Sequence, residues 1–275
     1  MQLELTDRDY RNFSDLIYEK SGINLHQGKR ELLKARLAKV LRQFEFRSVG
    51  EYYDYLMKDT SGDAFIPLLD VISTNLTAFL RESKHFEFLA DTAVPELFLP
   101  GGARGTREIR IWCAGCSSGE EAYSIAMTML DALPENRHKD LRILATDLST
   151  RMLQLADRGV YDAQRVEKIP YDLRRRYFQK GVNRWTGYYR VKPHVRSLVR
   201  FQRLNFMEPF SFSETFDIVF CRNVMIYFDK ETQEKLVNRF KEIIRSPGYL
   251  FIGHSESLTG VRHQFRYIRP SVYRI

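Results

Sequence analysis

The stretch from Ile109 to Ala126 constrains the fold of this chain more than any other. It begins as a short apolar strand, continues as a turn of small residues from Ala114 to Gly119, and ends as an amphipathic helix. In α/β proteins such a turn holds nucleotide-like cofactors, because small residues let the ligand approach the backbone and the N–H groups of the helix N-terminus face it. We therefore predict a cofactor site at this turn.

The residues of the turn and of the first helical turn indicate the kind of ligand. The turn lacks the GxGxxG spacing of a pyrophosphate site, and Glu120 and Glu121 place negative charge where phosphates would lie. Carboxylates suit a ligand with cationic and hydroxyl groups, such as the ammonium and ribose of S-adenosylmethionine. In the alternative interpretation, the two glutamates only favour the helix N-terminus through the helix dipole.

Size and composition set the broad class. A chain of 275 residues is long enough for one large α/β domain and a smaller one. No apolar run reaches the roughly 18 residues that span a bilayer, and the charged N-terminus does not resemble a signal peptide. Three cysteines form an odd, sparse set that is typical of a reducing compartment. We expect a cytoplasmic protein with no membrane insertion.

Neither cysteines nor histidines predict a metal site. Cys113 and Cys116 have CxxC spacing, but only one further cysteine exists and the pair lies at the end of a strand. The six histidines are scattered, without metal-ligand spacing and without an obvious catalytic grouping.

Apolar periodicity predicts two domains. Before residue 80, apolar residues recur at helical spacing in four segments and no strand is indicated, so residues 1–74 are expected to form a helical domain. From about residue 84, strands and helices alternate, which favours a parallel sheet covered by helices on both faces in a second domain, 75–275. The predicted strands are 109–113, 141–145, 216–221 and 248–253, with an antiparallel edge hairpin at 265–275.

The alternation breaks between about 157 and 205. Segments 185–194 and 198–204 resemble strands joined by turns, and they are expected to belong to a small antiparallel β insertion at about 160–203.

Polar residues at three places in the chain are candidates for the site. Asp147 ends the second strand, where an acidic side chain accepts hydrogen bonds from ribose hydroxyls, although it is also a candidate N-cap for the following helix. Arg222 and Asn223 follow a buried strand at the edge where ligands bind, with Tyr227 close behind. The third group has a spacing that fits neither helix nor strand, and alone it would also suit a capped linker. It consists of Asn75, Thr77 and Arg81.

The formal net charge of +8 attracts anionic partners. One early helix carries basic residues on nearly all of its non-apolar faces, opposed only by Glu31. It is either a solvated face or a docking surface for an acidic partner. The candidate docking residues are Lys29, Arg30, Lys34, Arg36 and Arg42.

Four ordered motifs closely resemble the CheR family of chemotaxis receptor methyltransferases. They are Asn75-x-Thr-x-x-x-Arg81-Glu82, Trp112-Cys-Ala-Gly-Cys-Ser-Ser-Gly-Glu-Glu121 with Tyr123-Ser-Ile-Ala126, Ala145-Thr-Asp147, and Phe220-Cys-Arg-Asn-Val-Met-Ile-Tyr-Phe-Asp229. Gly253-His-Ser-Glu256 also fits, and the resemblance covers essentially the whole chain.

The resemblance implies a helical N-terminal domain that docks the receptor and a Rossmann-like class I S-adenosylmethionine-dependent methyltransferase domain with an inserted antiparallel β subdomain. The implied reaction forms glutamyl γ-methyl esters on cytoplasmic helices of chemoreceptors and releases S-adenosylhomocysteine. Arg81 and Tyr227 are implied to orient the reactants. The implied cofactor-binding residues are Asn75, Thr77, Arg81, Glu121, Asp147, Asn205, Phe206, Arg222 and Asn223.

In some members, the β subdomain, here around Gly187 to Phe201, binds a peptide at the receptor C-terminus. The loop 181–186 does not clearly match those members, so this partner stays open. A nucleic-acid methyltransferase is disfavoured because no Asn/Asp-Pro-Pro-aromatic stretch follows the strand that ends at Cys221, and no nucleic acid partner is expected. A module that binds the cofactor without turnover is the remaining alternative.

Overall fold

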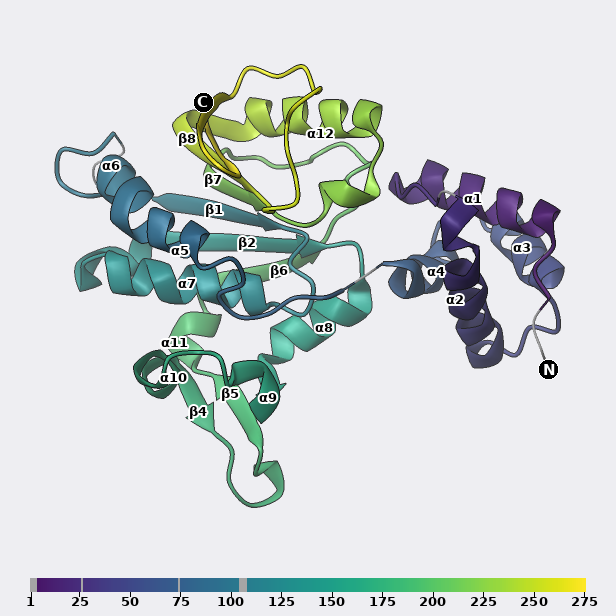
Figure 1. The fold of residues 1–275 in the computed structure, drawn as a ribbon. Coiled ribbons are helices and arrows are strands. Elements are labelled where there is room, and N and C mark those ends of the chain that lie inside the picture. Colours follow the sequence, from purple (N-terminus) through teal and green to yellow (C-terminus); the bar gives the residue numbers. More distant parts are fainter. Residues whose placement is uncertain (1–3, 26, 74, 104–107) are drawn as a thin grey trace.

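The computed structural model describes residues 4–25, 27–73, 75–103 and 108–275. Figure 1 shows a helical bundle at the N-terminus beside a larger α/β part, with a small β subdomain projecting from the latter. The predicted boundary residue Thr74 and His26 lie outside the described residues. None of the described helices is long and apolar enough to cross a membrane.

The N-terminal bundle contains the four predicted helices. The first begins at a capping box, in which the Thr6 hydroxyl accepts from the Asp9 N–H, and ends at Gly22, whose φ of 72° suits a glycine. Fully buried apolar side chains such as Phe13, Leu33 and Leu37 form its core. The helices are α1 (Asp7–Ser21), α2 (Arg30–Gln43), α3 (Val49–Lys58) and α4 (Phe65–Ile72), with a 3₁₀ turn η1 (Gln27–Lys29) before α2.

A helical run leads from the bundle to the sheet. It comprises α5 (Lys84–Phe88), a π-helical stretch η2 (Leu89–Ala93) and α6 (Val94–Phe98).

The central sheet has seven strands in the order β6-β2-β1-β7-β8-β10-β9. Its first five strands are parallel, and β10 runs antiparallel to both β8 and β9, which confirms the predicted C-terminal hairpin. The strands are β1 (Ile109–Ala114), β2 (Leu141–Asp147), β6 (Val199–Arg203), β7 (Phe216–Cys221), β8 (Ile244–Ile252), β9 (Arg266–Arg269) and β10 (Val272–Arg274).

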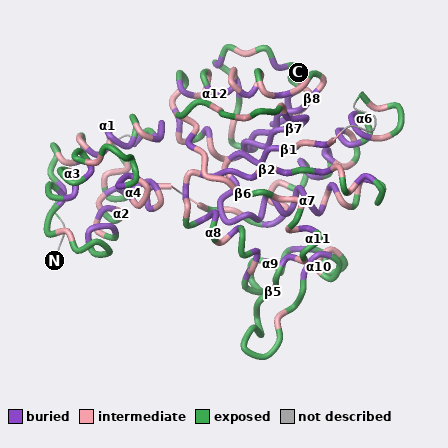
Figure 2. The backbone as a smooth tube through the Cα atoms, turned by 180° about the vertical axis from the view of Figure 1, so that it is seen from behind, coloured by how far each residue is buried: buried purple, intermediate pink, exposed green. Residues whose placement is uncertain are grey.

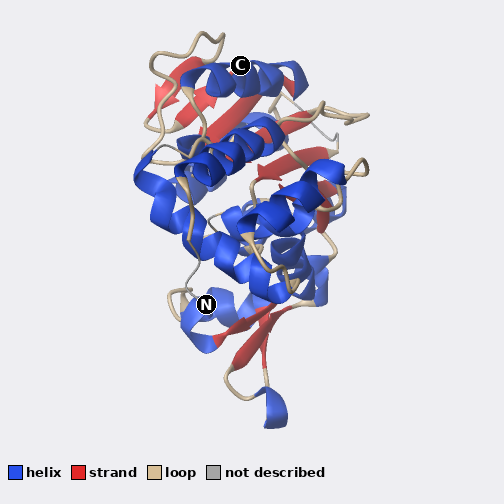
Figure 3. Cartoon of the chain, turned by 90° about the vertical axis from the view of Figure 1, so that its right-hand side faces the viewer, coloured by secondary structure: helices blue, strands red, loops and turns tan. Residues whose placement is uncertain are grey.

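Helices cover both faces of this sheet, as Figures 1 and 3 show. Because side chains alternate along a strand, Trp112 of β1 packs into the core that includes α12, whereas Ile111 packs into the core that includes α7. Figure 2 shows the central strands of this sheet, such as β1 and β7, as largely buried. The remaining elements here are α7 (Glu120–Ala132), η3 (Glu135–Asp140), α8 (Thr150–Arg158), η5 (Met225–Tyr227) and α12 (Lys230–Ile243).

The β subdomain is a three-stranded antiparallel sheet in the order β3-β5-β4. The expectation that 198–204 belongs to it is wrong. Residues 199–203 form β6, which pairs parallel with β2 from Ile143↔Val199 to Asp147↔Arg203, so the insertion ends before this strand. The subdomain contains β3 (Val160–Asp162), α9 (Ala163–Val166), α10 (Tyr171–Tyr177), β4 (Phe178–Lys180), η4 (Asn183–Trp185) and β5 (Tyr188–Val191), and α11 (Pro193–Arg196) leads back to the main sheet.

Candidate active site

One cavity lies where the carboxyl ends of β1, β2 and β7 meet the helical bundle, the position at which open α/β sheets bind ligands. The bundle contributes Ser21, Ile23 and Ile72 to its wall. Every residue for which the sequence resemblance implied a cofactor or orienting role also lines it. These are Asn75, Thr77, Arg81, Glu121, Asp147, Asn205, Phe206, Arg222, Asn223 and Tyr227.

The glycine turn after β1 forms the tight floor of this cavity. Gly115 and Gly119 have φ values of 88° and 95°. A Cβ atom on Gly115 would lie 2.4 Å from Val224 Cγ2, so no larger residue fits there. The Gly115 and Cys116 N–H groups donate to the Thr146 carbonyl at 2.8 and 2.9 Å, which fixes the turn to the end of β2.

Asp147 holds the backbone on both sides of the cavity floor. Its Oδ2 accepts from the Ser117 N–H at 2.7 Å, and its Oδ1 accepts from the Ser149 N–H at 2.9 Å. The N-cap alternative for Asp147 is wrong, because the Ser149 hydroxyl caps α8 by accepting from the Met152 N–H. Burial raises the pKa of Asp147. Each carboxylate oxygen has a second lone pair with which to accept from a ligand hydroxyl.

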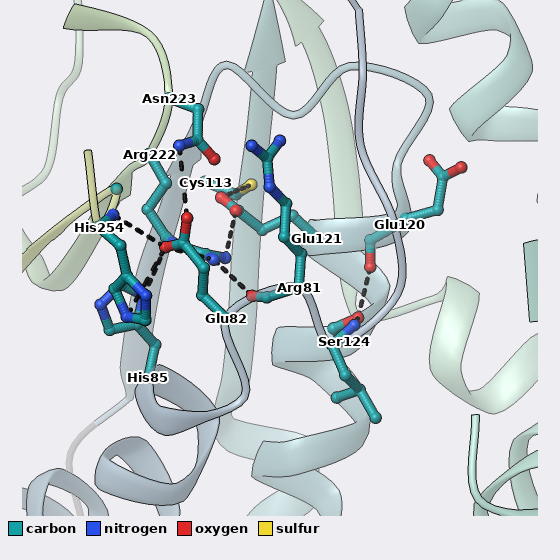
Figure 4. A network of polar contacts seen from close by, with 12 residues as sticks. Arg81, Glu82, His85, Cys113, Glu120, Glu121, Ser124, Arg222, Asn223 and His254 are labelled. Atoms are coloured by element: carbon teal, nitrogen blue, oxygen red, sulfur yellow. Dashed lines mark hydrogen bonds and ion pairs between the residues drawn. The ribbon is translucent and has the colours of Figure 1, made fainter. Parts of the chain in front are cut away.

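Glu121 and Arg222 form a buried ion pair at the back of the cavity (Figure 4). Arg222 Nη1 lies 2.6 Å from Glu121 Oε2, and its Nη2 lies 3.0 Å from Glu82 Oε2 and also donates to the Arg81 carbonyl. Burial raises the pKa of Glu121, and the Arg222 guanidinium acts in the opposite direction. Since an unpaired buried charge is costly, these groups depend on one another.

Glu120 does not face this cavity, contrary to the expectation for the pair of glutamates. It is buried against the β subdomain, where it accepts from the Ser118 hydroxyl at 2.7 Å and pairs with Arg165 at 2.9 Å. Consecutive residues of a helix point about 100° apart, so only Glu121 faces the cavity.

Several non-glycine residues around the cavity have left-handed backbone conformations. Leu80, Ser117 and Asn223 have φ values of 52°, 48° and 58°. The backbone N–H of each residue donates to a side-chain oxygen. Leu80 donates to Ser124 Oγ at 2.9 Å, Ser117 donates to Asp147 Oδ2 at 2.7 Å, and Asn223 donates to Glu256 Oε2 at 2.9 Å. Such strained residues persist only where surrounding contacts fix them, and they concentrate at functional sites.

The loop before α5 is tied to the glycine turn and to itself. The Ser117 hydroxyl donates to the Asn75 carbonyl at 3.0 Å, and Arg81 Nη1 donates to the Leu76 carbonyl at 2.9 Å. The side chains of Asn75, Thr77 and Arg81 therefore reach the cavity from an irregular segment, which explains why their spacing fits neither helix nor strand.

Asn205 and Tyr227 connect the cavity to the helical bundle. Asn205 Nδ2 donates to the Lys20 carbonyl at 2.6 Å, and the Asn24 N–H donates to the Tyr227 carbonyl at 2.9 Å. The Lys29 ammonium lies 5.7 Å from the centroid of the Tyr227 ring, so this basic residue lies beside a residue of the cavity wall.

The other candidate docking residues extend along α2. Arg30 is engaged by Asp7 within the bundle, and Arg42 is exposed, with its Nε donating to the Ala38 carbonyl at 3.1 Å. Lys34 and Arg36 are half-buried on the same helix.

Sequence reasoning missed the contact between His85 and His254, which are far apart in the chain and whose ring centroids lie 4.7 Å apart. His85 Nδ1 is 3.5 Å from Glu82 Oε2, and His254 Nε2 is 4.0 Å from it, so the three side chains have ligand atoms close enough for a metal ion. Glu82 Oε2 already pairs with Arg222. Burial, and after it the Arg222 charge, lower the pKa of His85 to about 3, so its imidazole is neutral near pH 7. The pairing of Glu82 with Arg222 favours a structural role for this cluster over a metal site.

The cavity, its glycine turn and the sheet order define a Rossmann-like methyltransferase domain with a cofactor cavity at the sheet edge. The family description "CheR methyltransferase, SAM binding domain" matches residues 75–274, and "CheR methyltransferase, all-alpha domain" matches residues 8–73. This chain therefore belongs to the CheR methyltransferase family.

Full-length relatives support the same assignment. The chain is 39% identical to the chemotaxis protein methyltransferase of Borreliella burgdorferi, covering 100% of this chain and 96% of that protein. It is 37% identical to chemotaxis protein methyltransferase 2 of Pseudomonas aeruginosa, covering 99% and 94%. It is 34% identical to the chemotaxis protein methyltransferase of Escherichia coli, covering 100% and 93%.

Proposed function

We propose that this chain transfers the methyl group of S-adenosylmethionine to glutamate γ-carboxylates on the cytoplasmic helices of chemoreceptors, for sensory adaptation. The products are a glutamyl methyl ester and S-adenosylhomocysteine. The observation that carries the proposal is the convergence of the ten implied site residues, from separate parts of the chain, on one cavity. A cytoplasmic location follows from that substrate.

The chemistry needs no general base. A glutamate carboxylate has a pKa of about 4.3 and is ionised at neutral pH, so its oxygen is already a nucleophile. This oxygen bonds to the methyl carbon while the carbon–sulfur bond breaks, and the electron pair stays on sulfur. An anion and a sulfonium cation give two neutral products. A cavity poor in water therefore favours the reaction, and alignment of the reactants supplies most of the rate.

The contacts of the buried network support distinct proposed roles for these residues. Asp147 is proposed to accept from the ribose hydroxyls, with Asn205 and Phe206 beside the adenine. Asn75, Thr77, Arg81 and Glu121 are proposed at the methionine end of the cofactor. Since Arg222 is engaged by Glu121 and Glu82, its role is to hold these groups, and it is not expected to bind the substrate carboxylate tightly.

Arg81 and Tyr227 are proposed to orient the reactants at the methyl group, without transferring a proton. Tyr227 is suited to this role because the bundle fixes its backbone carbonyl through Asn24 and Lys29 lies at its ring. An oxygen held too tightly by a cation would be a poorer nucleophile, so both residues are expected to give weak contacts.

The basic residues of α2 are proposed to dock the acidic methylation region of the receptor. Charge complementarity supports this assignment, and Lys29 at Tyr227 connects the docking helix to the cavity. Arg30 contributes less than the others, because Asp7 already neutralises it.

The β subdomain is proposed as the site for a receptor C-terminal peptide. The lining of a second pocket there includes Val182, Trp185, Tyr188 and Tyr189 together with the basic Lys180 and Arg190. Trp185 is 52% exposed and Val182 is 70% exposed, which is unusual for such large apolar side chains. An apolar or aromatic residue beside a carboxylate would suit these groups.

Transfer of tritiated methyl from S-adenosylmethionine to a cytoplasmic receptor fragment tests the proposal. We expect base-labile label that disappears when the target glutamates are replaced by alanine. Cofactor binding without transfer to any chemoreceptor fragment would favour a module that binds the cofactor without turnover. Label on nucleic acid would favour a nucleic-acid methyltransferase.

A further inference from the structure

Glu256 lies behind the cavity wall and binds the backbone of the segment that follows β7. Its Oε2 accepts from the Gly253 N–H at 2.6 Å and from the Asn223 N–H at 2.9 Å, and its Oε1 accepts from the Ile226 N–H at 3.2 Å. One carboxylate therefore joins the end of β8 to both ends of the segment 223–226. Glu256 is absent from the lining of the cavity, so it does not contact a ligand there directly.

The conformation of Asn223 explains why this anchor is needed. Asn223 has a φ of 58°, a left-handed conformation that is uncommon for residues with a side chain, although asparagine adopts it more readily than most. Its Nδ2 lies 3.4 Å from Glu82 Oε1, so the side chain turns toward the ion-pair network. Without an acceptor, the Asn223 N–H would lose the contact that opposes relaxation to an ordinary conformation.

Gly253 shows how closely the two chain segments approach one another. A Cβ atom at this position would lie 2.4 Å from Asn223 Nδ2, 2.9 Å from Asn223 N and 2.9 Å from Glu256 Oε2. The glycine allows the carboxylate to reach the Asn223 N–H, so Gly253 and Glu256 act together in the sequence Gly253-His-Ser-Glu256.

We propose that Glu256 is a positioning residue for methyl transfer. By holding the backbone at 223 and 226, it places the side chains of Asn223 and of Tyr227, the residue after Ile226, both of which line the cavity. The inference rests on the proposed function, because it requires that Asn223 and Tyr227 act on bound cofactor and substrate. A carboxylate suits the role because it accepts without donating, whereas a glutamine would turn an N–H group toward at least one of the three donors.

The first experiment compares Glu256→Gln with the wild type. We expect the Kd for S-adenosylhomocysteine, measured by calorimetry, to rise about tenfold to a hundredfold, which is the range for a lost hydrogen bond to a charged group. Since Tyr227 also shifts, kcat should fall as well. Glu256→Asp keeps the charge on a shorter side chain and should give an intermediate Kd.

Glu234→Gln is the matched control. Glu234 also accepts a backbone N–H, that of Arg262 at 3.0 Å, but it does not line the cavity. The Glu234→Gln variant should have the same Kd for S-adenosylhomocysteine and the same kcat as the wild type, even if its thermal stability is lower. An equal change in Kd for the Glu234 and Glu256 variants would show a general loss of stability and would overturn the inference.

A double-mutant cycle tests whether Glu256 acts through Asn223. In the Asn223→Ala background, Glu256→Gln should change the Kd by less than about threefold, because interacting residues give non-additive effects. Full additivity would overturn the inference. A wild type that does not bind S-adenosylhomocysteine would contradict the proposed site, whereas a wild type that binds and a Gln variant with unchanged Kd and kcat would contradict only the role of Glu256.

Discussion

The cofactor cavity and the basic face of α2 use charge in opposite ways. In the cavity, Arg222 is buried and held by two carboxylates at 2.6 and 3.0 Å, so its charge fixes geometry. On α2, Arg42 is exposed and its Nε donates to the Ala38 carbonyl of the same helix, so its charge is available to attract a partner. Buried charges are insulated from salt, whereas exposed charges are screened by it. The two regions should therefore respond differently to substitution, pH and ionic strength.

The largest effect is expected from Asp147→Ala. The substitution removes the proposed ribose acceptor together with the acceptor of the Ser117 and Ser149 N–H groups. Since hydrogen bonds to a charged group contribute about 1.5–3 kcal/mol each, the Kd for S-adenosylhomocysteine should rise by about two orders of magnitude or more. Calorimetric titration measures this change.

Asp162→Ala is the control for that experiment. Asp162 likewise accepts a backbone N–H, from Arg165 at 3.0 Å, but in the β subdomain and outside the cavity. Cofactor affinity should be unaffected. A Kd for Asp147→Ala close to that of the wild type would exclude Asp147 from the ribose site.

A pH effect on stability is expected next, from His85. Its pKa is about 3 in the folded chain and about 6.5 when unfolded, so between these values the unfolded chain binds more protons. Stability should therefore fall as the pH is lowered below 6.5, by about 2 kcal/mol between pH 7 and pH 5. Urea unfolding of the wild type and of His85→Phe at both pH values measures this contribution, and an equal loss in both proteins would assign it to other groups.

Salt should distinguish the docking face from the cavity. Raising the ionic strength is expected to lower kcat/KM for the receptor fragment several-fold, while the Kd for S-adenosylhomocysteine changes little. The double variant Lys34→Ala, Arg36→Ala should show a smaller salt effect and a higher KM for the receptor. Lys58→Ala, which removes an exposed charge from the end of α3, is the control. Equal salt dependence of both steps would remove the case for electrostatic docking.

The sequence was most informative where backbone chemistry is local. The glycine turn and the strand-ending Asp147 have fixed relations to the strands before them, so the fold of this edge could be predicted. Contacts between residues that are far apart in the chain could not be predicted, because no local sequence pattern marks them. Asn223 meets Glu256 because β8 lies beside β7. His85 meets His254 because α5 packs against the end of β8, where the His85 ring lies 5.7 Å from that of Phe251. Glu120 was misjudged because its direction depends on the rotation of α7, and 198–204 because a short strand does not reveal which sheet it joins.

The smallest effect is expected from Tyr227→Phe, which tests whether the cavity orients its substrate or activates it. If Tyr227 only aligns the reactants, loss of its hydroxyl should lower kcat by less than about tenfold, with the Kd for S-adenosylhomocysteine near that of the wild type. The ring stays in place, because its packing and the Asn24 contact with its carbonyl do not involve the hydroxyl. Single-turnover methyl transfer at several pH values checks this role. A loss of a thousandfold, or a new pH dependence near neutrality, would instead show that Tyr227 takes part in proton transfer, in conflict with a nucleophile that is already ionised.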